Sequence, residues 1–515
     1  MLPEFRNEPL TDFSVESNRK AFQTALAKVQ SELGREWPII IDGQQKTTGQ
    51  TFARLNPAQT TEAIAKFAKG TKETALEAVA AADKHFQEWS HWQPEARARI
   101  LLRAAAMLRR RKHEFSATMV LEVGKNWAEA DGDTAEAIDF MEFYAREMMR
   151  LAEPQPLVGI AGEEENLYYI PLGVGAVIPP WNFPLAILVG MTTASLVAGN
   201  TVVLKPASAS PFIAWRFYNL LEEAGLPPGV LNFLPGPGGA IGDTIVSHPR
   251  TRFIAFTGSK EVGLHIQRLA AEIAPGQIWI KRTILEMGGK DCILVDESAN
   301  PEEAAQGIYA SAFGFQGQKC SACSRAIIHE SLYDEVVSRV AEMAQKTTIG
   351  PTKDFGNFLG PVVDEGAFNK IMEYIEIGKK EGKLLTGGER GPAGGWFIRP
   401  TIFGDIGPDA RIFQEEIFGP VLACSKVKSF EQGLEYANAT DYGLTGALYS
   451  NNRQHLEIAR RDFHVGNLYF NRKCTGALVG AQPFGGFNMS GTDSKAGGRD
   501  YLLLFTQAKS VSERF

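Results

Sequence analysis

The sequence lacks an apolar run long enough to cross a membrane. Its most apolar stretch, Pro184–Gly199, is interrupted by Thr192, Thr193 and Ser195 and is shorter than the roughly 20 residues that a spanning helix needs. The opening residues, MLPEFR, contain no apolar segment of the kind found in secretory signals. These two absences predict a protein of the cytoplasm that has no membrane partner.

Cysteine is scarce: five residues, at positions 292, 320, 323, 424 and 474, are spread over 515. An odd, scattered set indicates a reducing compartment rather than a disulfide framework. Cys320 and Cys323 form a CxxC pair, but no second CxxC and no close histidine pair is present to complete a zinc site. We therefore expect no metal and interpret Cys323 as a buried structural cysteine, with a functional dithiol as the alternative.

An excess of positive charge is absent as well. Lysine and arginine contribute 53 residues and aspartate and glutamate 60, which gives a formal net charge of −7. A chain with this balance has no general affinity for nucleic acids or anionic lipids, so we expect neither as a partner.

The length of 515 residues exceeds what one hydrophobic core usually holds, so two or three domains are expected. The first 150 residues are predicted to be mostly helical, with helices over 74–89, 96–115 and 127–151. From Gly173 onward, helix-length segments alternate with short β-branched runs at 174–178, 201–204, 253–256, 283–285 and 292–295. This alternation predicts a parallel, doubly wound sheet, and a second α/β set begins near Pro301.

A candidate nucleophile lies in the segment GQKCSAC at 317–323. Cys320 follows a lysine at a predicted loop-to-helix junction. A helix N-terminus and a nearby cation both lower the pKa of a thiol, which favours the reactive thiolate. Cysteine peptidases and related hydrolases also use such a thiol, but they need a partner histidine, and none of the eight histidines lies in a recognisable motif.

Two further segments place polar groups where the backbone is unusually free or unusually stiff. Glu286 ends a predicted strand and precedes Gly288 and Gly289, so its carboxylate is expected at the sheet edge where doubly wound sheets bind ligands. Asn182 lies in PPWNFP, whose prolines can orient its amide toward a developing oxyanion. Taken alone, a surface carboxylate beside a turn and a stiff loop around a buried tryptophan are equally good interpretations.

Four other segments complete a recognisable set: KPA at 205–207, FTGS at 256–259, EEIFGP at 415–420 and PFGG at 483–486. In this order and spacing, the seven segments resemble the aldehyde dehydrogenase superfamily over nearly the whole chain. The resemblance implies an α/β fold with two doubly wound domains, a Rossmann-type cofactor domain and a catalytic domain, plus a small β bridging element.

The same resemblance implies domain boundaries and an assembly. It assigns 1–155 and 171–286 to the NAD(P)-binding domain, 287–485 to the catalytic domain, and 156–170 and 486–515 to the bridging element. A C-terminal strand over 508–515 and a segment near Tyr168 and Tyr169 are expected to form that element. Its role in the family predicts a homodimer or a higher assembly of dimers.

A covalent mechanism follows from the resemblance. The Cys320 thiolate attacks the aldehyde carbonyl, and the oxyanion accepts hydrogen bonds from the Asn182 side chain and the Cys320 N–H group. Hydride transfer to the nicotinamide leaves a thioester, and Glu286 takes a proton from the water that hydrolyses it to the carboxylic acid.

The implied cofactor site uses a strand-to-helix turn that is not the usual GxGxxG. Ser259, with Gly258 before it, would lie near the pyrophosphate at a helix N-terminus. Lys205 would reach the adenosine ribose, Glu416 the nicotinamide ribose, and Phe418 the nicotinamide ring, beside Pro180 and Trp181. NAD-selective relatives carry a glutamate where this chain has Ser208, so we expect NAD with NADP as the alternative.

Within the superfamily, three segments most resemble 1-pyrroline-5-carboxylate dehydrogenases: KCS at 319–321, NRKCTGALVG at 471–480 and PFGGFNMSGT at 483–492. That family oxidises L-glutamate γ-semialdehyde to L-glutamate in proline degradation. The likeness implies that Ser321, Gly476 and Ala477 bind the substrate α-carboxylate. Phe183 and Phe484 would clamp its aliphatic part, and Glu136 is expected near its α-ammonium group.

Two other functions are compatible with the sequence. One is a dehydrogenase for another semialdehyde, such as succinate semialdehyde, which would share the mechanism but not the anchor. The other is a non-enzymatic structural member of the superfamily, which we would expect to have lost Cys320, Glu286 or Asn182. All three residues are present.

Overall fold

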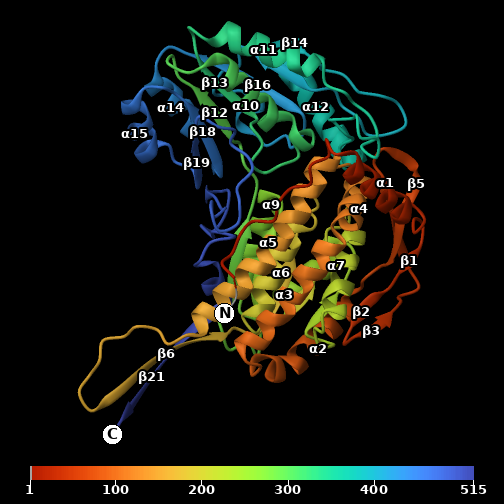
Figure 1. The fold of residues 1–515 in the computed structure, drawn as a ribbon, viewed down its shortest axis with the longest axis vertical. Helices are drawn as coiled ribbons and strands as arrows, with labels where there is room; N and C mark the ends of the chain where they lie inside the picture. Colours follow the sequence, from red (N-terminus) through yellow and green to blue (C-terminus); the bar gives the residue numbers. More distant parts are fainter. Residues whose placement is uncertain (1–2) are drawn as a thin grey trace.

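The computed structural model describes residues 3–515, apart from the side chain of Ala240 (Figure 1). A seven-stranded sheet, the first sheet, has the order β11-β10-β7-β8-β9-β2-β3. The β-branched runs at 174–178, 201–204, 253–256 and 283–285 belong to this sheet, whereas the run at 292–295 lies in a second sheet. Five adjacent strands of the first sheet, from β11 to β9, run parallel, as predicted. They are β7 (Val174–Ile178), β8 (Thr201–Leu204), β9 (Leu231–Phe233), β10 (Thr251–Thr257) and β11 (Arg282–Glu286). The antiparallel strands β2 (Ile39–Ile41) and β3 (Gln44–Lys46) extend one edge.

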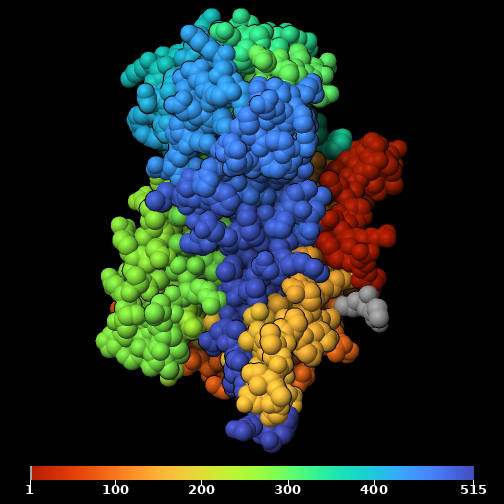
Figure 2. Space-filling model, turned by 90° about the vertical axis from the view of Figure 1, so that its left-hand side faces the viewer, coloured from red at the N-terminus to blue at the C-terminus, as the bar shows by residue number. Residues whose placement is uncertain are grey.

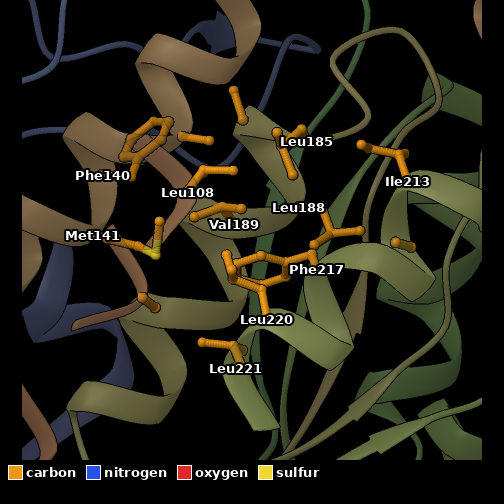
Figure 3. Close-up of a cluster of buried hydrophobic side chains, with 14 of the residues drawn as sticks. Leu108, Phe140, Met141, Leu185, Leu188, Val189, Ile213, Phe217, Leu220 and Leu221 are labelled. Carbon is orange, nitrogen blue, oxygen red and sulfur yellow. The ribbon is translucent and has the colours of Figure 1, made fainter. Parts of the chain in front are cut away.

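Helices cover both faces of the first sheet, which makes it doubly wound. One face packs against α2 (Lys72–Ser90), α8 (Asp243–Ser247) and α9 (Lys260–Ala271). The other face carries α3 (Pro94–Arg110), α4 (Lys112–Val123), α5 (Trp127–Ala152), α6 (Ala186–Val197) and α7 (Pro211–Glu223). Figure 3 shows the core of this second layer, where Leu108, Met141, Val189 and Phe217 come together from four helices. Complete burial of such side chains contributes about 1.5–3 kcal/mol each.

The first 150 residues are less uniformly helical than predicted. After α1 (Glu16–Gln30), the chain forms β2 and β3 and a three-stranded sheet made of β1 (Glu36–Trp37), β4 (Thr51–Asn56) and β5 (Gln59–Ala68). β5 has three alanines, which have low β propensity, and β4 has no run of β-branched residues, so pairing rather than composition defines these two strands. The helix expected over 96–115 is in fact two helices, because the backbone of Arg111 departs from helical geometry.

A second seven-stranded sheet and its helices lie at the top of Figure 1. Its strand order is β14-β15-β16-β13-β12-β18-β19, and only β14 is antiparallel to its neighbour. The strands are β12 (Cys292–Val295), β13 (Arg325–His329), β14 (Lys383–Thr386), β15 (Thr401–Gly404), β16 (Val421–Val427), β18 (Thr445–Tyr449) and β19 (Asn467–Phe470). The second α/β set predicted from Pro301 is therefore confirmed.

Helices flank this second sheet on both sides too. One side buries α10 (Pro301–Phe313) and α11 (Tyr333–Gln345). The other buries α12 (Glu365–Glu381), α14 (Phe430–Asn438) and α15 (Arg453–Asp462), with the short α13 (Arg411–Gln414) beside them.

A long two-stranded antiparallel sheet projects from the lower end of the molecule (Figure 1). It pairs β6 (Glu163–Pro171) with β21 (Thr506–Arg514), so the expected union of the C-terminal strand with the 168–169 region is confirmed. Figure 2 shows the two segments together at the base of the molecule. Residues before β21 pack elsewhere: β20 (Phe487–Asn488) pairs with β17 (Tyr442–Gly443), and the 3-10 helix η3 (Tyr501–Phe505) is largely buried. Among residues 3–515, no helix is both long and apolar enough to span a bilayer.

Candidate active site

Two cavities meet at Cys320. The larger, of about 590 Å³, lies at the carboxyl ends of the first-sheet strands, where parallel sheets usually bind ligands. The smaller, of about 110 Å³, is lined by α5, α6, the end of β11 and residues from 476 to 501. Thr257, Met287 and Cys320 line both cavities. A group on the Cys320 side chain can therefore react with molecules held on either side.

The backbone around Cys320 differs from the predicted loop-to-helix junction. A 3-10 turn, η2 (Gly314–Gly317), precedes it, and residues 318–324 lead into β13 without a helix. The adjacent Lys319 is engaged elsewhere, since its ammonium pairs with Glu129 at 2.7 Å. Burial, together with nearby carboxylates, raises the pKa of the Cys320 thiol well above its usual value. The predicted lowering of this pKa is therefore wrong for the protein without substrate or cofactor.

Asn182 lies next to the nucleophile segment. It is buried in the turn before α6, and its side-chain Nδ2 donates to the Gln318 carbonyl oxygen at 3.1 Å. Gln318 precedes Cys320 by two residues, so this bond fixes the amide beside the thiol. The arrangement suits an amide donor to an oxyanion formed on Cys320.

Glu286 is the last residue of β11 and lines the smaller cavity with Cys320. Its Oε1 accepts a hydrogen bond from the Ser494 hydroxyl. Its Oε2 is buried and has no hydrogen-bond partner among residues 3–515. Burial raises the pKa of the carboxyl to about 8, a value suited to a general base near neutral pH.

The larger cavity has the chemistry that a dinucleotide requires. The Lys205 ammonium is buried, its one hydrogen bond within residues 3–515 is a 3.4 Å bond to the Pro206 carbonyl oxygen, and burial lowers its pKa to about 8. Ser259 caps the N-terminus of α9, where phosphate groups bind favourably, and Gly258 precedes it. A buried cation short of partners and a helix N-terminus in one cavity fit the ribose and the pyrophosphate of NAD.

The other end of this cavity carries the residues expected near the nicotinamide. Glu416 Oε1 accepts from the Gly289 N–H at 2.9 Å, and a Cβ at Gly288 would lie 2.3 Å from Glu416 Oε2. Phe418 packs edge-to-face on Trp181, with ring centroids 5.5 Å apart, and Pro180 also lines the wall. Ser208 is exposed and does not line this cavity; its hydroxyl donates to the Gly236 carbonyl at 3.3 Å.

The smaller cavity brings together every residue expected to bind the substrate. These are Glu136, Phe183, Ser321, Gly476, Ala477 and Phe484. Within residues 3–515, the N–H groups of Gly476 and Ala477 have no acceptor in the protein. Gly476 has φ +80°, a left-handed conformation that disfavours any residue with a side chain. Two free N–H groups and a serine side chain that line one cavity are donors of the kind that a carboxylate requires.

Comparison with known proteins agrees with this geometry. Residues 44–511 match the aldehyde dehydrogenase family. The chain belongs to that family.

Several relatives carry a more specific name. The 1-pyrroline-5-carboxylate dehydrogenases of Geobacillus sp. (strain WCH70) and Geobacillus kaustophilus (strain HTA426) are 62% and 61% identical, each over the full length of both chains. A solved 1-pyrroline-5-carboxylate dehydrogenase from Thermus with bound NAD is 52% identical, with a TM-score of 0.98 and complete coverage of both chains. An aldehyde dehydrogenase from Bacillus cereus in complex with NAD+ is 32% identical, with a TM-score of 0.90, covering 95% of this chain and 98% of that one.

Some residues of this aldehyde dehydrogenase site were not identified from the sequence. Lys125 and Asp133 form a buried ion pair at 2.9 Å, and the Lys125 ammonium lies 3.9 Å from the centroid of the Phe183 ring. Glu129, Asp133 and Glu136 recur at helical spacing on α5, and that carboxylate stripe was the available signal. The prediction used only Glu136.

Two other features also differ in importance from the sequence interpretation. Gly238 and Gly239, for which no role was predicted, line the larger cavity. Ser494 had no role assigned, although it lies two residues beyond Thr492, the end of a recognised segment. By contrast, Cys323 is buried, as the sequence interpretation expects, and its Sγ donates to the Arg325 carbonyl oxygen at 3.3 Å.

Proposed function

We propose that the chain oxidises L-glutamate γ-semialdehyde, which is in equilibrium with 1-pyrroline-5-carboxylate, to L-glutamate with NAD as part of proline degradation. One observation carries the proposal: the free N–H groups of Gly476 and Ala477 and the Ser321 side chain line the same cavity as Cys320. An aldehyde whose far end is a carboxylate can bind there with its carbonyl at the thiol. The names of the Geobacillus and Thermus relatives support this choice of substrate.

In the proposed reaction, the Cys320 thiol loses its proton to solvent, and the resulting thiolate adds to the aldehyde carbon. The Asn182 amide and the Cys320 N–H donate hydrogen bonds to the oxygen, which becomes negative as the bond forms. Phe183 and Phe484 hold the aliphatic chain, and Glu136 faces its ammonium group. Oxidation leaves a thioester on Cys320.

When bound, NAD would supply the acceptor for the hydride that leaves this carbon. Lys205, Ser259 and Glu416 would hold the cofactor, and Phe418 and Trp181 would confine its reactive end. Glu286 then removes a proton from water, which attacks the thioester and releases glutamate. The raised pKa makes the Glu286 carboxylate a stronger base than an ordinary glutamate, so it accepts the water proton more readily.

We further propose that 1–155 and 171–286 form the cofactor domain and 287–485 the catalytic domain. The bridging element, 156–170 with 486–515, would pair subunits through its two-stranded sheet. The side chains of Tyr168, Val511 and Phe515 at this sheet are hydrophobic and exposed, which suits a surface that a second copy covers. All five cysteines are free thiols, as expected of a protein from a reducing compartment.

The carboxylate anchor is tested by Ser321→Ala. Hydrogen bonds to charged groups contribute roughly 1.5–3 kcal/mol, so the loss of this hydroxyl should lower kcat/KM for glutamate semialdehyde by about tenfold. Pentanal, which lacks both charged groups, should be oxidised by the variant and the unaltered protein at nearly equal rates. Initial rates of NADH formation with both aldehydes provide the measurement. Equal losses for the two substrates would contradict the assignment of Ser321 to the carboxylate.

A further inference from the structure

Ser494 makes a direct contact with the carboxylate of Glu286. Its side chain is only 2% exposed, and its hydroxyl donates to Glu286 Oε1. A Cβ at Gly485 would lie 1.7 Å from the Ser494 carbonyl oxygen and 3.0 Å from Glu286 Oε1. The absence of a side chain at position 485 therefore lets the serine and the carboxylate meet.

The loop that carries Ser494 is closed at its base and fixed to the Glu286 strand. Reciprocal 2.8 Å backbone hydrogen bonds between Phe484 and Ala496 close it. The Thr492 N–H donates to the Leu285 carbonyl at 3.0 Å, and the Leu285 N–H donates to the Thr492 hydroxyl, also at 3.0 Å. The Ser494 hydroxyl is thus held at a defined position relative to the end of β11.

The neighbouring charges do not replace this contact. The Lys495 ammonium favours the ionised carboxylate, but it donates instead to the carbonyl oxygens of Gly466 and Gly485, at 2.7 and 2.6 Å. Asp493 opposes ionisation of Glu286. The other titratable groups that interact with Glu286 are the Cys320 thiol and the Tyr501 hydroxyl. The Gly486 N–H also favours the ionised carboxyl, to a smaller extent than Ser494. Among residues 3–515, Ser494 is the side chain that donates a hydrogen bond directly to Glu286.

We propose that Ser494 is a positioning residue for the general base: its hydroxyl fixes Oε1 and stabilises the carboxylate, which leaves Oε2 to take the proton from the hydrolytic water. The buried Oε2, which has no partner among residues 3–515, fits that division of roles. The inference rests on the proposed function, in which Glu286 acts on a thioester at Cys320.

The test is the decay of an acetyl group placed on Cys320 by p-nitrophenyl acetate, followed by intact-protein mass spectrometry at pH values that bracket 8. Decay in the unaltered protein should accelerate with pH and have its midpoint near the Glu286 pKa of about 8, since only the ionised carboxyl accepts a proton. In Ser494→Ala the midpoint should move up by about one pH unit, and decay below it should slow about tenfold. Ser494→Thr, which keeps the hydroxyl, should retain the original midpoint.

A matched control is Thr492→Val, which removes a hydroxyl from the same loop. The Thr492 hydroxyl contacts the Leu285 backbone and not the Glu286 carboxylate. Its midpoint should stay where it is in the unaltered protein. If Ser494→Ala does not fold, Ser494→Cys replaces it; a thiol donates weakly, so the midpoint should still move up. An unchanged midpoint in the variant that folds, or an equal shift in Thr492→Val, would overturn the inference alone. An acetyl label that still forms in Cys320→Ala would instead overturn the proposed function.

Discussion

Cys320→Ala loses at least about 10⁴-fold in aldehyde oxidation and keeps its affinity for NAD nearly unchanged. The thiol is the atom expected to bond to substrate, so no neighbouring group can replace it. The side chains expected to hold the cofactor, Lys205, Ser259 and Glu416, are untouched by the substitution. NADH formation measures the first effect, and titration of NAD by fluorescence or calorimetry measures the second.

Cys323→Ala is the matched control for this prediction. Cys323 is a buried thiol three residues away, bonded to the Arg325 carbonyl, and lines only a small void outside both main cavities. Its variant should retain most of the activity, at some cost in stability for the lost packing. An active Cys320→Ala beside an inactive Cys323→Ala would show that the nucleophile is assigned to the wrong residue.

Glu286→Gln separates formation of the thioester from its hydrolysis. The substitution keeps the side-chain volume but removes the group that accepts the water proton. Rapid mixing with aldehyde and NAD should therefore give a burst of about one NADH per active site, followed by a steady state slower by about 10²–10⁴-fold. Stopped-flow absorbance of NADH resolves the two phases.

The amplitude of the burst is the decisive part of that experiment. The Glu286 carboxylate contributes to the raised pKa of Cys320, which places the two groups near one another. If the burst disappears together with the steady state, Glu286 also deprotonates the thiol, and its role is not confined to hydrolysis.

The parallel architecture could be predicted from the sequence because its signals are local. The runs at 174–178, 201–204 and 253–256 combine β-branched residues with helix-length spacers, and each forms a strand of the first sheet. β4 and β5 have no such signal: β4 has a single β-branched residue, Thr51, and the alanines, lysine and glutamate of β5 are compatible with helix. Their conformation depends on pairing with each other, which is a contact that composition does not report.

The residues of the site could be named largely from recognised segments, but their electrostatics could not. Lys319 next to Cys320 suggests a lowered thiol pKa, yet its ammonium pairs with Glu129, which lies 190 positions earlier in the chain. Likewise, the contact of Ser494 with Glu286 joins residues 208 positions apart. Such effects arise from burial and from neighbours brought close by the fold, so they become visible only in three dimensions.

The substrate assignment is tested most directly by comparing glutamate semialdehyde with pentanal in the unaltered protein. Both aldehydes have five carbons, but only the first has the α-carboxylate that Gly476, Ala477 and Ser321 are proposed to bind. Charge-assisted hydrogen bonds of that kind predict a kcat/KM at least about tenfold higher for glutamate semialdehyde, measured as NADH formation. Equal kcat/KM values for the two aldehydes would contradict the proposed substrate and leave only a general aldehyde dehydrogenase.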